Sequence, residues 1–327
     1  MTGTQNAIDA DSFREYRTMS RMGNASLPSA PPPALSPVSK TPFAWPIAIG
    51  AAAFAYAAKT LWQQSIFLST LFSQWHTNPQ SIGMLGLEII LCIGMLAAAC
   101  LLLARGYRQP LLFAAGAIVA QIIYYMHRGT FEYMFRTRFR DVTYFIDLLV
   151  ALVPPAILIT CLLHPRLRPH LALWRQAAVT KSTKSFGPTW PIGIAAAAIM
   201  LGAMDVLALL STVLRLAYGL QSFPPLRLDP GRVFWMSVHF GGALFLVCGG
   251  WLLLRRRRLT VLLLYFPYRL CVVFVAPLLA PELLTGTFSF YIYGMYIELL
   301  LAGAMLISPI RRQLLEWTRS RLAGPPT

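Results

Sequence analysis

The sequence predicts an all-α integral membrane protein with about eight transmembrane helices, arranged as two parallel four-helix repeats. Composition supports this class, because 57% of the 327 residues are apolar and 12% are charged, whereas soluble domains carry about 25% charged residues. Apolar runs of about 20 residues, long enough to cross a bilayer, recur between arginine-rich breaks. Similar segments open two of these runs about 145 residues apart, which indicates an internal repeat.

The apolar runs divide the chain into five regions. Residues 1–42 are polar and proline-rich, which predicts a disordered cytoplasmic tail. Residues 43–165 form the first four-helix membrane repeat, and residues 189–309 form the second. Residues 166–188 form a cytoplasmic amphipathic linker between them, and residues 310–327 form a cytoplasmic amphipathic tail. The predicted spans lie at 44–69, 83–104, 110–127, 142–163, 190–213, 233–254, 259–279 and 287–307.

Three matches in the same order support the repeat. Each half opens with Trp-Pro-Ile, beginning at Trp45 and at Trp190, and an alanine-rich stretch follows. The second span of each half ends in three consecutive leucines that run into arginine. The fourth span of each half is followed by proline, basic residues and an amphipathic segment that contains Trp174 or Trp317. Because each half has an even number of spans, the two repeats run parallel through the membrane.

The basic residues predict the orientation of the spans. The chain has a net charge of +16, and 19 of its 28 lysine and arginine residues fall on one side of the predicted topology. The positive-inside rule explains this bias without a nucleic-acid partner and places both termini in the cytoplasm. Richness in alanine, leucine and arginine favours a bacterial inner membrane. All five cysteines fall within predicted spans without a CxxC pair, so we expect no disulfide, metal site or cofactor.

Arg269 and Glu298 are predicted to form an ion pair near the bilayer midplane. Each lies about 16 Å from the cytoplasmic end of its span, and the two spans are consecutive. A charge within a span costs about 2.5–3.5 kcal/mol on insertion scales, so such residues turn toward partners or water. Tyr265 and Tyr268 are placed to satisfy the remaining hydrogen-bonding capacity. The pair is either a structural contact that fixes helix packing or the gate or coupling pair of a transport cycle.

A second layer of ionisable residues is predicted nearer the outer face, about 21–25 Å from the cytoplasmic ends of the spans. It comprises Lys59, Glu88, Asp147, Asp205 and His239. Because these residues come from both repeats, they predict a polar cavity between the repeats, where transporter sites tend to lie. The alternative is that Lys59 pairs with Asp205 while the other side chains extend toward the membrane surface.

The outer loop after the third span interleaves arginine with aromatic residues between His127 and Asp141. Its basic residues are Arg128, Arg136, Arg138 and Arg140. Arginine beside aromatic rings is suited to an anionic lipid headgroup or an anionic glycan at the outer face. An aromatic belt whose arginines reach the membrane surface explains the same pattern.

No motif in the sequence names a substrate or a reaction, because phosphate-binding loops and the HExxH and GxSxG signatures are absent. The first hypothesis is a transporter or flippase-like protein for a small or amphiphilic solute, with the outer layer as its site. The alternative is a non-catalytic membrane subunit or anchor of a larger envelope complex, which binds proteins through its N-terminal tail. An enzyme that acts on lipid-linked substrates is a third hypothesis, although the sequence favours a protein without catalytic activity.

Overall fold

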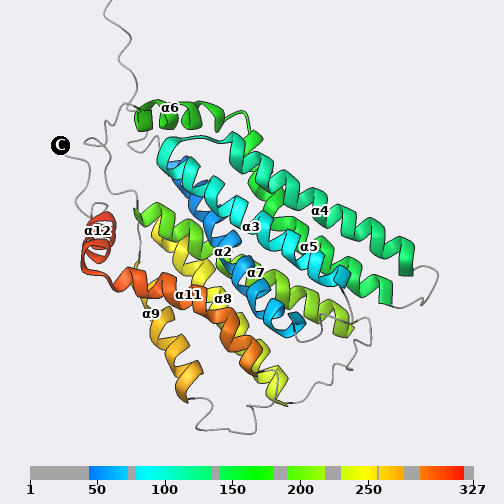
Figure 1. Ribbon diagram of the computed structural model, residues 1–327. Helices are drawn as coiled ribbons and strands as arrows, with labels where there is room; N and C mark the ends of the chain where they lie inside the picture. Colours follow the sequence, from blue (N-terminus) through cyan, green and yellow to red (C-terminus); the bar gives the residue numbers. More distant parts are fainter. Residues whose placement is uncertain are drawn as a thin grey trace, which may run out of the picture. The chain divides into compact units, whose positions relative to one another are not determined.

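The structure is a computed structural model, and every regular element among its described residues is helical. The described residues are 44–72, 79–133, 140–179, 190–217, 230–255, 258–275 and 288–319. The predicted cytoplasmic tail, residues 1–42, lies outside them. The helices follow one another in the order expected from the apolar runs, and Figure 1 shows how they are arranged.

The first half of the chain forms four long helices and one short one. The long helices are α2 (Ala44–Phe72), α3 (Pro79–Arg105), α4 (Gln109–Tyr133) and α5 (Arg140–Leu163). The short helix α6 (Arg168–Val179) turns away from α5 by 76° at the break around Pro165. Proline interrupts the helix there because it lacks the amide hydrogen that would continue the hydrogen-bond ladder.

The second half follows a similar order. It comprises α7 (Trp190–Ala217), α8 (Pro230–Leu254), α9 (Thr260–Leu270), α11 (Phe288–Leu306) and α12 (Ser308–Arg319). A π-helical turn, Cys271–Val275, continues α9 beyond Arg269. Such turns occur frequently at functional sites.

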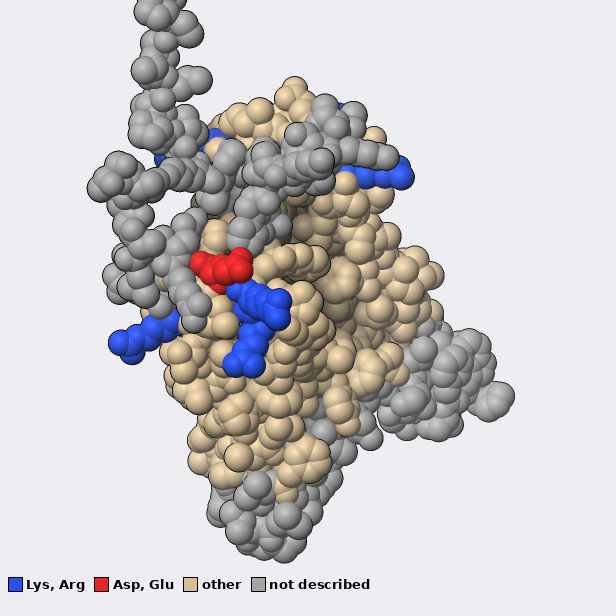
Figure 2. All heavy atoms as spheres, turned by 90° about the vertical axis from the view of Figure 1, so that its left-hand side faces the viewer, with Lys and Arg blue, Asp and Glu red and all other residues tan. Residues whose placement is uncertain are grey.

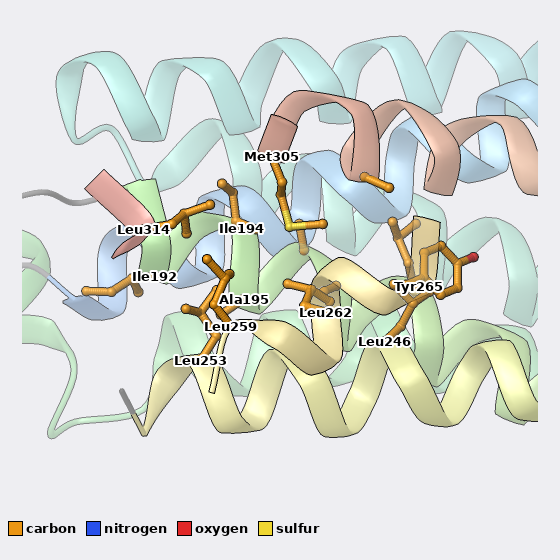
Figure 3. Close-up of a cluster of buried hydrophobic side chains, with 14 of the residues drawn as sticks. Ile192, Ile194, Ala195, Leu246, Leu253, Leu259, Leu262, Tyr265, Met305 and Leu314 are labelled. Carbon is orange, nitrogen blue, oxygen red and sulfur yellow. The ribbon is translucent and has the colours of Figure 1, made fainter. Parts of the chain in front are cut away.

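Helices α2 and α7 pack against each other, and each also packs against the helix that follows it in the chain. Two apolar cores result, one around α3 and α4 and the other around α8 and α9. Figure 3 shows the second core, in which Leu246 and Leu253 of α8 meet Leu262 of α9. Tyr265 lies at one end of this core, with its hydroxyl directed away from the apolar side chains.

The short helices α6 and α12 are attached to the bundle by the same type of hydrogen bond. The indole of Trp174 on α6 donates to the carbonyl oxygen of Leu102 at 2.9 Å. The indole of Trp317 on α12 donates to the carbonyl oxygen of Leu253 at 3.1 Å. Both acceptors lie near the ends of their helices, in the leucine triplets that the two halves of the sequence share.

The helices indicate a membrane-embedded protein. Four described segments are long and apolar enough to cross a membrane, and Leu148–Leu163 adds a fifth if it is taken together with α6. Large apolar side chains such as Phe113 and Leu300 lie on the surface, where lipid would cover them. On the face shown in Figure 2, charged side chains gather toward the end that carries α6 and α12. The described parts of the windows at 44–69, 259–279 and 287–307 are helical, but the count of eight spans stays a prediction.

Candidate functional site

Lys59 lies at the centre of a charged cluster inside the bundle. Its ammonium nitrogen is 2.5 Å from Oδ1 of Asp205 on α7 and 2.7 Å from Oε1 of Glu298 on α11. Lys59 is 2% exposed and Glu298 1%, so both contacts are shielded from solvent. The cluster thereby joins α2, α7 and α11, which brings together residues from both halves of the chain.

Arg269 supplies the second cation of the cluster. Its Nη2 atom lies 2.8 Å from Oε2 of Glu298, so the ion pair predicted from the sequence is present. The same nitrogen is 4.0 Å from Oδ2 of Asp205. Tyr265 accepts a hydrogen bond from Nε of Arg269 at 2.6 Å and donates its own hydroxyl hydrogen to Glu298. The hydroxyl therefore orients both members of the pair.

A glycine makes room for the arginine. Gly242 lies on α8, where a Cβ atom would fall 2.6 Å from Cζ of Arg269. A larger residue would displace the guanidinium, because carbon atoms pack at separations of about 3.5–4.0 Å. The side chain of Tyr268 lies beside the neighbouring Gly241 and donates to the carbonyl oxygen of Val238 at 2.6 Å. Helix α8 is thus shaped to accept the polar side chains of α9.

The charges of the cluster balance, because two cations face two carboxylates. Burying one of them alone would be costly, and removing one partner of a buried pair typically costs about 3–5 kcal/mol. Among the described residues, Oδ2 of Asp205 and Nη1 of Arg269 have no hydrogen-bond partner. The cluster therefore retains one unused acceptor and one unused donor, on residues whose closest charged atoms are 4.0 Å apart.

The two layers that the sequence predicted are joined by side-chain contacts through Lys59 and Asp205. Lys59 contacts Glu298, which the sequence assigned to the midplane layer. The predicted depths refer to Cα positions along the helices, and those of Lys59 and Glu298 differ by about 5 Å. A lysine side chain has four methylene groups and bridges that difference. The alternative pairing of Lys59 with Asp205 is confirmed.

Glu88 lies apart from the cluster, in a cavity of about 440 Å³ lined by α2, α3, α4, α5 and α7. Its carboxylate accepts a hydrogen bond from Nε2 of Gln64 at 2.7 Å. Gln121 and Tyr125 are hydrogen-bonded to each other at 2.7 Å and also line the cavity. Apolar side chains such as Ile118 complete the wall. Among the described residues that line this cavity, Glu88 carries the only formal charge.

Among the remaining predicted site residues, only His239 has a side chain that the structure describes. His239 is buried on α8, one helical turn before Gly242. The side chain of Asp147 on α5 lies outside the described residues. The same holds for the basic residues of the outer loop, Arg128, Arg136, Arg138 and Arg140, so the predicted headgroup or glycan contact stays a prediction.

Sequence reasoning missed the neutral polar residues of the cavity. Gln64, Gln121 and Tyr125 carry no formal charge, so the pattern of charged residues within the spans does not reveal them. The sequence nevertheless contains a signal for them, because a side-chain amide within an apolar helix needs a hydrogen-bond partner, just as a charged group needs a counter-charge.

The described residues contain no group of three or more His, Cys, Asp or Glu side chains that could hold a metal ion. The described residues instead form a charge-balanced cluster and, beside it, a cavity with both polar and apolar walls. Comparison with protein-family models, with curated proteins and with solved structures finds no match to this chain.

Proposed function

We propose that this chain is a transporter or flippase-like protein, and that its solute is a small amphiphilic molecule with a cationic or hydrogen-bond-donating group. The observation that carries the proposal is the 440 Å³ cavity around Glu88. Its volume lies within the range of about 300–1,000 Å³ that is typical of small-molecule sites. Its single carboxylate and its amides would bind the polar group of the solute, and its apolar wall would accept the hydrophobic part.

The cavity and the charged cluster lie on adjacent faces of the same two helices. On α2, Thr60 lines the cavity while the adjacent Lys59 belongs to the cluster. On α7, Met204 and Ala208 line the cavity while Asp205 belongs to the cluster. A solute that moves α2 relative to α7 would therefore change the geometry of both sites. This arrangement couples binding in the cavity to pairing in the cluster.

The cluster has a second pairing within reach. Asp205 now contacts Lys59 at 2.5 Å, and its other oxygen lies 4.0 Å from Arg269. A small shift of α7 would exchange one cation for the other without leaving a carboxylate alone. Discrete alternatives of this kind are what a two-state transport cycle requires.

We further propose that the two halves are parallel repeats of four spans each, in a bacterial inner membrane with both termini in the cytoplasm. The hydrogen bonds of Trp174 and Trp317 to leucine carbonyls support the repeat, because they tie corresponding short helices to corresponding long ones. In transporters, the site commonly lies between such repeats. The cavity fits that rule, since α7 closes it against helices of the first half.

Flux measurements on the full-length protein in proteoliposomes test the proposal. Ethidium, an amphiphilic organic cation, is the first probe, and wild-type flux should exceed that of empty vesicles. Glu88→Gln should lower ethidium flux roughly tenfold or more, since hydrogen bonds to charged groups contribute about 1.5–3 kcal/mol. Glu316→Gln, which alters an exposed acid on α12, is the matched control and should transport normally. The proposal would be overturned if the flux of ethidium, and also that of neutral and anionic amphiphiles, did not exceed the flux measured with empty vesicles.

The alternative function, a non-catalytic subunit or anchor of an envelope complex, is favoured by the complete burial of Arg269 and Glu298. A cluster that only holds helices together would have this property. Affinity purification distinguishes the two functions. Protein partners that are lost when residues 1–42 are deleted, together with background flux, would favour the subunit.

A further inference from the structure

Three arginines surround a pocket at the end of the bundle that carries α6, far from the cavity of Glu88. Arg108 lies in the turn between α3 and α4, whereas Arg168 and Arg175 lie on α6. The pocket has a volume of about 680 Å³. Its described lining also includes the amides of Gln109 and Gln176 but no acidic residue. The pocket is therefore rich in donors and positive charge.

The walls of this pocket are held in place by specific contacts. Gly106 has a φ angle of 71°, and a Cβ atom there would lie 2.5 Å from the Cα atom of Arg175. The turn and α6 can approach this closely only because the residue is glycine. The guanidinium of Arg175 also lies over the ring of Tyr107, with 5.2 Å between its Cζ atom and the ring centroid. The hydrogen bond from Trp174, the residue before Arg175, to Leu102 also holds α6 against the end of α3.

The position of the pocket relative to the apolar surface indicates what it binds. Helix α6 is bent by 76° from α5, as expected for a helix that lies along the membrane surface beside a spanning one. Gln109 lines the pocket, and Phe113, one turn further along the same face of α4, is 78% exposed. A molecule whose anionic group occupied the pocket could therefore extend an acyl chain over exposed apolar side chains.

We propose that this pocket binds the phosphate-bearing headgroup of an anionic phospholipid. Arginine forms bidentate hydrogen bonds with phosphate oxygens, and basic pockets beside membrane helices bind such headgroups. The proposal differs from the predicted contact of the outer-loop arginines, because it uses different residues at the other ends of α4 and α5. It is also independent of the proposed transport function.

Lipid titration of the full-length protein in detergent, followed by native mass spectrometry, tests the proposal. Dioleoyl phosphatidylglycerol should bind, and dioleoyl phosphatidylcholine should bind much more weakly. The triple variant Arg108→Gln, Arg168→Gln and Arg175→Gln should lose roughly tenfold or more in affinity for phosphatidylglycerol. The control variant Arg258→Gln, Arg311→Gln and Arg312→Gln removes the same charge from exposed positions of the second half. Its affinity should stay within about twofold of wild type.

Three outcomes would overturn the proposal. Equal losses in the two triple variants would mean that diffuse surface charge, and not the pocket, attracts the lipid. Equal affinity for phosphatidylcholine would remove the requirement for an anionic headgroup. Competition by inorganic phosphate at concentrations equal to those of the lipid would identify free phosphate as the ligand. If the triple variant does not fold, Arg168→Glu alone reverses one exposed charge of the pocket and should weaken phosphatidylglycerol binding relative to Arg311→Glu.

Discussion

Lys59 and Glu298 are separated by 239 positions in the chain, and their side chains meet at 2.7 Å inside the bundle. This contact brings α11 against α2, the first helix that the structure describes. Glu298 at the same time contacts Arg269, so its two oxygens are shared between two cations. The carboxylate of Glu298 is thus one of the points at which the two halves of the molecule are held together, beside the packing of α2 against α7.

Lys59→Met should destabilise the protein strongly. It leaves two carboxylates facing Arg269 alone, and an uncompensated buried charge typically costs about 3–5 kcal/mol. The double variant Lys59→Met with Asp205→Asn restores the balance of charge and should recover a large part of the loss. Thermal unfolding in detergent, monitored by size-exclusion chromatography, measures both. Equal stability of the single and double variants would contradict the charge balance.

Tyr265→Phe should lower stability by about 1–3 kcal/mol, because it removes one hydrogen bond to Glu298 and one from Arg269 in a buried site. The side chain keeps its apolar contacts with the second core. Tyr124→Phe is a suitable control, since Tyr124 is 53% exposed. Thermal unfolding of the two variants under identical conditions is the measurement. A loss no larger than that of the control would show that the hydroxyl does not support the pair.

Gly242→Ala should displace the guanidinium of Arg269, because the added methyl group would lie 2.6 Å from its Cζ atom. We expect a stability loss of about 1–3 kcal/mol, as for other overpacked sites. Gly303→Ala on α11 adds the same methyl group where no atom lies within 4 Å, and it should leave stability unchanged or slightly higher. Unfolding midpoints of the two variants compare the sites directly. Similar midpoints would mean that the guanidinium of Arg269 can shift away from the added methyl group without a loss of stability.

Trp174→Phe and Trp317→Phe should produce losses of similar size, about 0.5–1.5 kcal/mol each. Each substitution removes the hydrogen bond that an indole donates to a leucine carbonyl at a helix end. Limited proteolysis after each substitution should report release of α6 or of α12, respectively. A large effect at one position and none at the other would argue against equivalent roles in the two halves.

The positions of the helices could be predicted from the sequence more accurately than the contacts between them. The window at 190–213 corresponds to Trp190–Ala217, because a long apolar run both defines a span and favours a helix. Arg269 and Glu298 were paired correctly because their helices are consecutive and their depths agree. The contact of Lys59 with Glu298 could not be predicted, since depth does not reveal that α11 packs against α2. A polar cavity between the repeats was predicted, but which of the predicted residues line it could not be, because that depends on how side chains of five helices fail to fill the space between them.

The way in which the cluster divides between the two halves has a consequence for biosynthesis. Residues 43–165 contribute one cation to it, Lys59, whereas residues 189–309 contribute Asp205, Arg269 and Glu298, with an excess of one anion. We therefore expect Lys59 to lack these two carboxylate partners until the second half has been synthesised and inserted. Expressed as separate polypeptides, the two fragments should each be degraded, and co-expression should rescue both.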